Sequence, residues 1–92
     1  MKLHRRVKSE KDGRTHYDLT LILEGNKLVE FSCTCRFMSF DYWSKKFQDS
    51  GTICRHILKI CGEEGIELPE KNQTERNLKL VDKYKKLFND KI

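Results

Sequence analysis

Two short pairs of residues carry the clearest chemical signal in this sequence. One residue separates Cys33 from Cys35, one residue separates Cys54 from His56, and residues 36–53 lie between the two pairs. Thiolate sulfur and imidazole nitrogen are ligands that Zn²⁺ prefers, and structural zinc sites use four of them in a tetrahedron. The two pairs supply one such set, so we expect a single structural Zn²⁺ ion bound by Cys33, Cys35, Cys54 and His56.

The fourth cysteine, Cys61, is expected to take no part in this site. If one helix carries Cys54 and Cys61, a rise of 1.5 Å per residue separates them by about 10 Å, too far for two ligands of one ion. A small apolar thiol on the buried face of a helix is ordinary. We therefore predict that Cys61 belongs to the core.

The expected metal site also indicates the cellular location and the class of protein. The beginning of the sequence lacks the apolar stretch of a signal peptide, so we expect a cytoplasmic location, where reducing conditions favour metal binding over disulfides. Intracellular disulfides of hyperthermophiles are the exception. Four protein ligands leave no open coordination position for water or substrate. We therefore expect a structural ion in a protein that is not an enzyme.

Three strands are predicted to position the first pair of ligands. Residues 2–10 and 15–23 alternate loosely in polarity and flank Asp12-Gly13, a dipeptide typical of hairpin turns. A second turn at residues 24–27 leads into residues 28–33, which are rich in β-formers. Because side chains alternate along a strand, Cys33 and Cys35 should project from the same face.

A helix is predicted to position the second pair. Apolar residues continue from Ile53 along one face, Thr52 is a plausible cap, and Gly62 or Gly65 can end the helix. Residues i and i+2 of a regular helix point about 200° apart. Cys54 and His56 can therefore converge only if Cys54 lies just before the helix or in an irregular first turn.

A second helix is expected at about residues 74–90, after a connector at residues 62–71. Its apolar face is predicted to hold four residues: Leu78, Val81, Tyr84 and Phe88. We expect this face to dock on the protein's own sheet. A groove on a partner protein is the alternative.

Length and composition limit the architecture. The chain has 92 residues, of which 37% are hydrophobic and 36% charged, which suits one folded domain better than a disordered chain. No run approaches the ~20 apolar residues of a spanning helix, so no membrane partner is expected. The predicted fold class is α+β: one domain over residues 1–92, with a small three-stranded antiparallel sheet, a zinc-finger core at about residues 18–62 and a C-terminal amphipathic helix.

The arrangement of the two pairs resembles the SWIM zinc finger, in which C-x-C, a variable spacer and C-x-H are followed by an apolar helix. Here the pairs are at residues 33–35 and 54–56, and Gly51 stands just ahead of the second. The resemblance covers about residues 18–62 and implies a ββα finger with the two pairs as ligands. Members of this family occur in transposases, remodelling ATPases, kinases and partners of RecA-superfamily recombinase paralogues, so the resemblance implies binding to DNA or to protein.

Nucleic acid, with DNA favoured, is the first expected partner. A net charge of +5 permits a polyanion partner, and residues 37–47 hold five aromatic side chains that either shield the ion as a small core or form an exposed platform. The candidate phosphate contacts are Arg5, Arg6, Arg36, Lys45, Lys46 and Arg55, and the candidate stacking residues are Tyr42 and Trp43. A solvated sheet edge is the other interpretation of the basic residues near the N-terminus.

A protein partner is the competing expectation. Either residues 75–90 or the aromatic residues 37–47 would bind a DNA-processing protein, such as a recombinase paralogue or an ATPase, as the family resemblance suggests. The modest net charge favours this alternative, because dedicated nucleic-acid binders often carry more charge.

Overall fold

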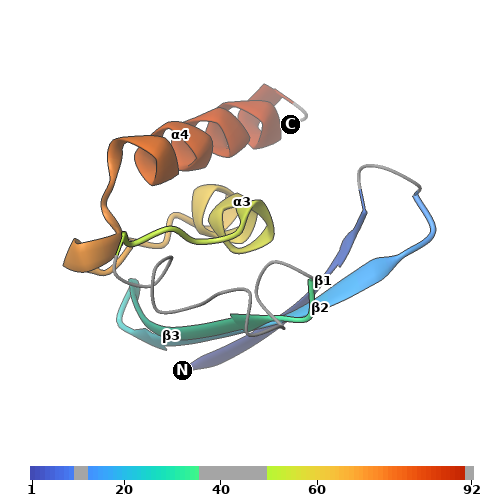
Figure 1. The fold of residues 1–92 in the computed structure, drawn as a ribbon, viewed down its shortest axis with the longest axis horizontal. Coiled ribbons are helices and arrows are strands. Elements are labelled where there is room, and N and C mark those ends of the chain that lie inside the picture. Colours follow the sequence, from blue (N-terminus) through green and yellow to red (C-terminus); the bar gives the residue numbers. More distant parts are fainter. Residues whose placement is uncertain (10–12, 36–49, 91–92) are drawn as a thin grey trace.

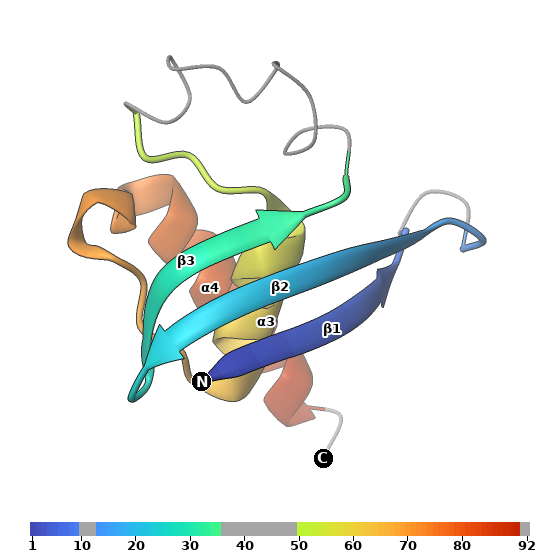
Figure 2. The same ribbon diagram turned by 90° about the horizontal axis from the view of Figure 1, so that it is seen from below.

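The predicted sheet is present, with its three strands in sequence order. A computed structural model describes residues 1–9, 13–35 and 50–90. Strand β1 (Lys2–Lys8) pairs antiparallel with β2 (His16–Glu24), which pairs antiparallel with β3 (Lys27–Cys33). The order is β1-β2-β3, so β2 is central (Figures 1 and 2). Gly25, whose φ is 64°, forms the tight turn between β2 and β3, a backbone conformation that favours glycine.

A β-bulge in β3 sets which side chains face the core. Ile22 pairs with Glu30 and Leu23 pairs with Leu28, so Val29 is an extra residue on β3. Leu28 and Cys33 are both buried although five positions separate them, and Val29 is 46% exposed. Strict alternation would have turned one of the two buried residues toward solvent, so the bulge places Leu28 and Cys33 on the same face.

Both helices lie on one face of the sheet, in two successive layers (Figure 1). Helix α3 (Arg55–Glu64) packs on β2 and β3, and helix α4 (Glu75–Asp90) packs on the outer side of α3. The fold is therefore α+β, as predicted. The prediction that α4 docks on the sheet is wrong, because α3 occupies that position and α4 docks on α3 instead.

The apolar face of α4 also differs from the prediction. Asn77 and Tyr84, two turns apart, are the buried residues of α4, and Val81 is partly buried between them. Asn77 contacts Gly51 and Asn72, and Tyr84 lies against Gly62 of α3. Leu78 is one residue, or 100°, away from Asn77 and is 47% exposed. Phe88 is 40% exposed because α4 has 16 residues and α3 only 10, so the last turns of α4 extend past their support.

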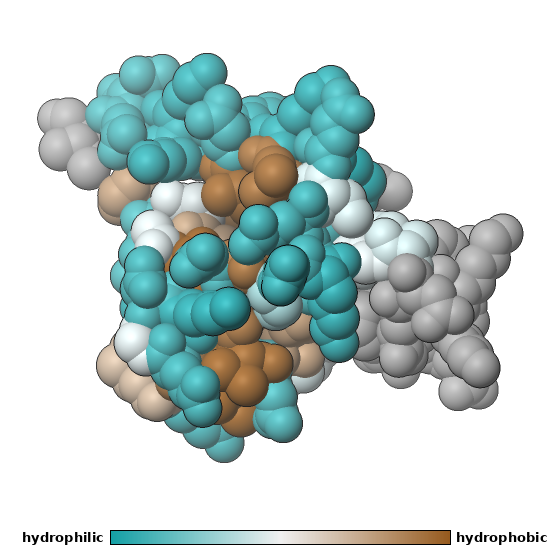
Figure 3. Space-filling model, turned by 90° about the vertical axis from the view of Figure 1, so that its left-hand side faces the viewer, coloured by the Kyte–Doolittle hydropathy of each residue, from teal (hydrophilic) through white to brown (hydrophobic). Residues whose placement is uncertain are grey.

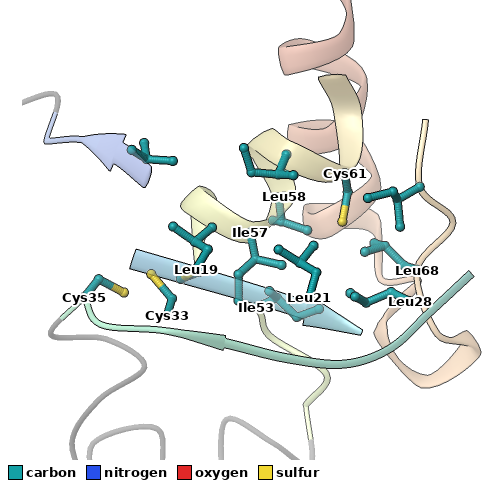
Figure 4. Packing of buried hydrophobic residues seen from close by; sticks show 14 of the residues in the cluster. Leu19, Leu21, Leu28, Cys33, Cys35, Ile53, Ile57, Leu58, Cys61 and Leu68 are labelled. Carbon is teal, nitrogen blue, oxygen red and sulfur yellow. The ribbon is translucent and has the colours of Figure 1, made fainter. Parts of the chain in front are cut away.

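The core fills the space between the sheet and α3. Its fully buried members include Leu19 and Leu21 from β2, Leu28 from β3, and Ile57 and Leu58 from α3 (Figure 4). Each such side chain contributes about 1.5–3 kcal/mol by leaving water. On the surface, Figure 3 shows hydrophobic residues in separate patches among hydrophilic ones.

The connector between the helices, residues 65–74, begins three residues later than predicted and contains a short helix of its own. Helix α3 ends at Gly65, the second of the two predicted stop signals, which adopts a φ of 68°. Gly62 instead lies inside α3, where it faces the backbone of α4 at Val81. Beyond Gly65, Glu67 exchanges backbone hydrogen bonds with residues 26 and 28, and a short 3-10 helix, η1 (Glu70–Asn72), precedes α4.

Several predictions fall on residues that lie outside the described part of the chain. They are the aromatic segment at residues 37–47, the candidate contacts Arg36, Tyr42, Trp43, Lys45 and Lys46, and residues 10–12 of the first turn. In the ranges that the structure describes, no helix is long and apolar enough to cross a membrane.

Candidate metal centre

The sheet delivers the first pair of candidate ligands to one end of the core. Cys33 is the last residue of β3, and Cys35 follows it by two positions. Both are buried, with 5% and 4% of their surface exposed. Their sulfur atoms lie near each other at the end of the strand, on the side that faces α3 (Figure 4), as the alternation of side chains predicts.

The start of α3 delivers the second pair. Cys54 is the residue that caps the helix, and its backbone is extended, with φ of −66° and ψ of 153°. His56 is the second residue of the helix. The turn of the chain between these residues brings both side chains to the same side, which meets the condition set by their spacing. Thr52 is not the cap, so that prediction was wrong, and Cys54 makes no side-chain capping hydrogen bond.

The four donor atoms form one compact cluster. The three Sγ atoms and a ring nitrogen of His56 all lie within 4.8 Å of one another. The Cys33 Sγ atom lies 3.8 Å from Nδ1 of His56. In a tetrahedron with bonds of about 2.3 Å to sulfur and about 2.0 Å to nitrogen, neighbouring ligand atoms stand roughly 3.5–3.8 Å apart. The cluster is therefore consistent with a single Zn²⁺ ion, and Nδ1 is the ring nitrogen of His56 that lies near Cys33.

Hydrogen bonds among the four donor groups shift their pKa values. Hydrogen bonding from Cys54, then from His56, lowers the pKa of Cys33 to about 4, even though burial opposes the change. The same interactions with Cys33 raise the pKa of Cys54 and that of His56. A cation placed at the centre would favour the charged thiolate forms of the cysteines and the neutral form of the imidazole.

A tyrosine that sequence reasoning missed holds the ring of His56. The centroids of the Tyr17 and His56 rings are 4.5 Å apart, with the planes tilted by 35°. Tyr17 is on β2, on the same face as Leu19 and Leu21, so alternation along the strand is a signal that could have found it. Its ring covers the imidazole and limits how the ligand can turn.

Cys61 lies in the core, away from the cluster, as predicted. It is 1% exposed and belongs to the hydrophobic core. It lies near Leu58 and Leu68, at the opposite end of the core from Cys33 and Cys35 (Figure 4). Burial raises the pKa of its thiol to about 12. All four cysteines are thiols and not disulfides in this structure.

The candidate nucleic-acid contacts that the structure describes do not form one patch. Arg55 lies beside the metal centre, at the start of α3. Arg5 points toward the other end of that helix, where it pairs with Glu64 at 3.4 Å. Arg6 and Asp18, paired at 3.7 Å, project from the opposite face of the sheet. Of the candidates in the described part of the chain, only Arg55 is thus placed next to the cluster.

A basic groove beside the metal centre was not predicted. Its lining residues are Arg55 from α3 and Glu75, Arg76, Lys79 and Leu80 from α4. The groove has a volume of about 620 Å³ and is shallow and largely open to solvent. It exists because α4 docks on α3, an arrangement that the sequence pattern did not indicate.

Comparisons of the chain with protein-family models, with curated proteins and with solved structures found no match. The geometry alone supports the site. Cys33, Cys35, Cys54 and His56 form a compact potential metal-binding site, consistent with one structural zinc ion.

Proposed function

We propose that this protein is a structural zinc module of the SWIM-like type that binds nucleic acid, with DNA favoured. The observation that carries the proposal is the convergence of three thiols and one imidazole within 4.8 Å, from two parts of the chain that only the fold brings together. Such a set is rare by chance and matches the ligands of structural zinc.

The ion would stabilise the fold and perform no chemistry. The four donors complete a tetrahedron, so no position is left for water or substrate, and we infer a protein that is not an enzyme. The ion would join the end of β3 to the start of α3. The site needs reduced thiols, which fits a cytoplasmic location.

The basic groove supports the choice of nucleic acid. Arg55, Arg76 and Lys79 bring three cations to one open surface beside the cluster, and Glu75 is the only acid among the lining residues that the structure describes. Lys79 pairs with that glutamate at 3.1 Å on the exposed surface, an interaction worth little in water and easily exchanged for a phosphate. The net charge of +5 permits the same class of partner.

A salt series tests the proposal. Protein of measured zinc content is titrated with single-stranded and duplex DNA and RNA at several salt concentrations. We expect log affinity to fall with log salt at a slope of about −3 to −5, because each phosphate contact releases a counterion. Arg55→Gln should reduce the slope by about 1, whereas Lys86→Gln, which removes an equal charge far along α4, should not. A flat salt response rejects nucleic-acid binding.

A protein partner is the second candidate, and the surface of α4 favours it. Leu78, Leu87 and Phe88 are each at least 40% exposed on this helix. A DNA-processing partner, such as a recombinase paralogue or an ATPase, would cover Leu87 and Phe88, which are neighbours near the end of the helix, whereas Leu78 lies half a turn around the helix from Leu87. The double substitution Leu87→Asp and Phe88→Asp tests this, because both side chains are exposed enough to change without unfolding the core. Loss of such a partner with DNA affinity intact favours the adaptor, and loss of neither rejects it.

A further inference from the structure

The short segment before Cys54 is held by side chains from a distant part of the chain. The backbone oxygen of Gly51 accepts hydrogen bonds from Nδ2 of Asn72, at 3.0 Å, and from Nδ2 of Asn77, at 2.7 Å. The same Asn77 amide donates to the backbone oxygen of Asn72 at 2.8 Å. Both asparagines are at most 2% exposed. Buried polar side chains are retained where they have partners, and here the shared partner is Gly51.

An arginine extends this network to the residue next to the ligand. Nη1 of Arg76 donates to the backbone oxygen of Ile53 at 2.9 Å and to Oδ1 of Asn77 at 2.9 Å. Ile53 immediately precedes Cys54 and is fully buried. Arg76 therefore fixes a carbonyl one residue from a metal ligand and also orients the asparagine that holds Gly51.

The backbone at Gly51 fits this arrangement closely. Its φ is 76°, and a Cβ atom built on it would overlap the backbone oxygen of Lys71. The segment at residues 51–53 thus lies directly against residues 71–77, with glycine required for both the backbone conformation and the contact. The start of α4 itself is fixed by Thr74, whose Oγ1 accepts a hydrogen bond from the backbone N–H of Asn77.

We propose that Asn72, Arg76 and Asn77 are positioning residues of the metal site. They supply no ligand, but they hold the backbone that carries Cys54 and His56 in the place where these side chains meet the thiols of β3. The inference rests on the proposed zinc site. It assigns to η1 and the first turn of α4 a role in retaining the ion, separate from the packing of the rest of α4 on α3.

Zinc release from variants of Arg76 tests the proposal. Arg76 is exposed enough that Arg76→Met should fold, and Lys79→Met is a matched control, because it removes the same charge one turn later without contacting residues 51–53. Each zinc-loaded protein is mixed with a chromophoric chelator, under conditions where circular dichroism shows it to be folded. The rate of zinc transfer is measured, together with the visible spectrum of the Co²⁺-substituted form.

We expect Arg76→Met to release zinc at least about tenfold faster than the unmodified protein, the effect typical of groups that orient metal ligands. Its Co²⁺ absorption bands should also weaken or shift, as they do when the tetrahedron is distorted. Lys79→Met should stay within about twofold of the unmodified rate. Arg76→Lys, which keeps a donor for Ile53, should be slower than Arg76→Met. Equal rates for Arg76→Met and Lys79→Met overturn the proposal, and so does equality of Arg76→Met and Arg76→Lys.

A second comparison separates positioning from general loss of stability. Asn77→Leu and Tyr84→Leu each alter a buried side chain of α4, but Asn77 donates a hydrogen bond to the backbone oxygen of Gly51, whereas Tyr84 lies against Gly62 of α3. At temperatures equally far below their melting midpoints, Asn77→Leu should release zinc about tenfold faster. Equal rates show that α4 acts only by packing and overturn the proposal. If the unmodified protein holds no stoichiometric zinc, the proposed function itself fails.

Discussion

The two halves of the metal site are held in different ways. Cys33 and Cys35 continue a strand whose backbone is hydrogen-bonded to its neighbour along the sheet. Cys54 follows a segment with no strand or helix of its own, which is fixed by side chains 21 to 26 residues away. The first half is built by a local hairpin, and the second only when the C-terminal helix is in place. Binding of the ion would therefore depend on the whole fold, including the C-terminal helix, and not only on the zinc-finger core.

The largest expected effect follows from removing the metal or one ligand from either half. Cys33→Ala and Cys54→Ala should both abolish stoichiometric zinc and unfold much of the chain, since structural zinc contributes about 10–16 kcal/mol of apparent binding free energy. Cys61→Ala is the control and should keep its zinc. Thermal melts with and without a chelator, on protein analysed by mass spectrometry, measure both effects. Identical melts of the unmodified protein in the two conditions would contradict the metal site.

Two glycine substitutions compare the strand that carries Cys33 with the segment that precedes Cys54. Gly25 and Gly51 have similar positive φ values, 64° and 76°, but only Gly51 has backbone atoms in the space of a Cβ. Gly25→Ala should cost about 1 kcal/mol for the conformation alone. Gly51→Ala should cost about 3 kcal/mol or more, because the chain must also move away from Lys71. Urea unfolding of the zinc-loaded proteins gives both values. Equal costs would mean that residues 51–53 are not tightly held.

The pH dependence of Cys61 offers a smaller effect. Burial raises the pKa of its thiol from 9.0 to about 12. Above pH 9 the unfolded chain loses this proton while the folded chain keeps it, so stability is complete below pH 9 and falls as the pH rises toward 12. Between pH 9 and pH 10 the unmodified protein should lose about 1 kcal/mol more than Cys61→Ala. Parallel pH profiles of the two proteins would show that Cys61 is accessible to water.

The smallest effect is expected for the ion pair that joins β1 to the last turn of α3. Arg5 pairs with Glu64 at 3.4 Å, and both side chains are more than a third exposed. Arg5→Met should lower the unfolding free energy by less than about 1 kcal/mol, because exposed ion pairs contribute little. Zinc release should not change. A larger loss, measured by urea unfolding, would place part of the site's support at this end of the helix.

The local patterns of the sequence explain what could be predicted. Alternation and hairpin turns indicated the three strands. The spacing of Cys54 and His56 required Cys54 to lie just before the helix or in an irregular first turn, and the structure places it just before the helix. These features depend on near neighbours along the chain. The cluster of four donors could be predicted because three cysteines and one histidine at this spacing match the ligands of a structural zinc site.

Other features depend on contacts that no local pattern encodes. The apolar residues of α4 would look the same whether they docked on the sheet or on α3, so the predicted face included Leu78, which is exposed. Asn72 and Asn77 look like ordinary polar residues of a connector and a helix. Their role depends on the backbone oxygen of Gly51, more than twenty residues away. Long-range side-chain to backbone bonds have no periodic signal.

The extra residue in β3 has a consequence for changes in chain length. Loss of Val29 would leave Leu28, Phe31 and Cys33 in regular alternation on the same side, so a chain shortened there should still present its thiols to α3. Loss of Ser32 would turn Cys33 and Cys35 to the opposite side of the sheet. Two deletions of equal size, three residues apart, should thus have opposite outcomes, one tolerated and one fatal to metal capture.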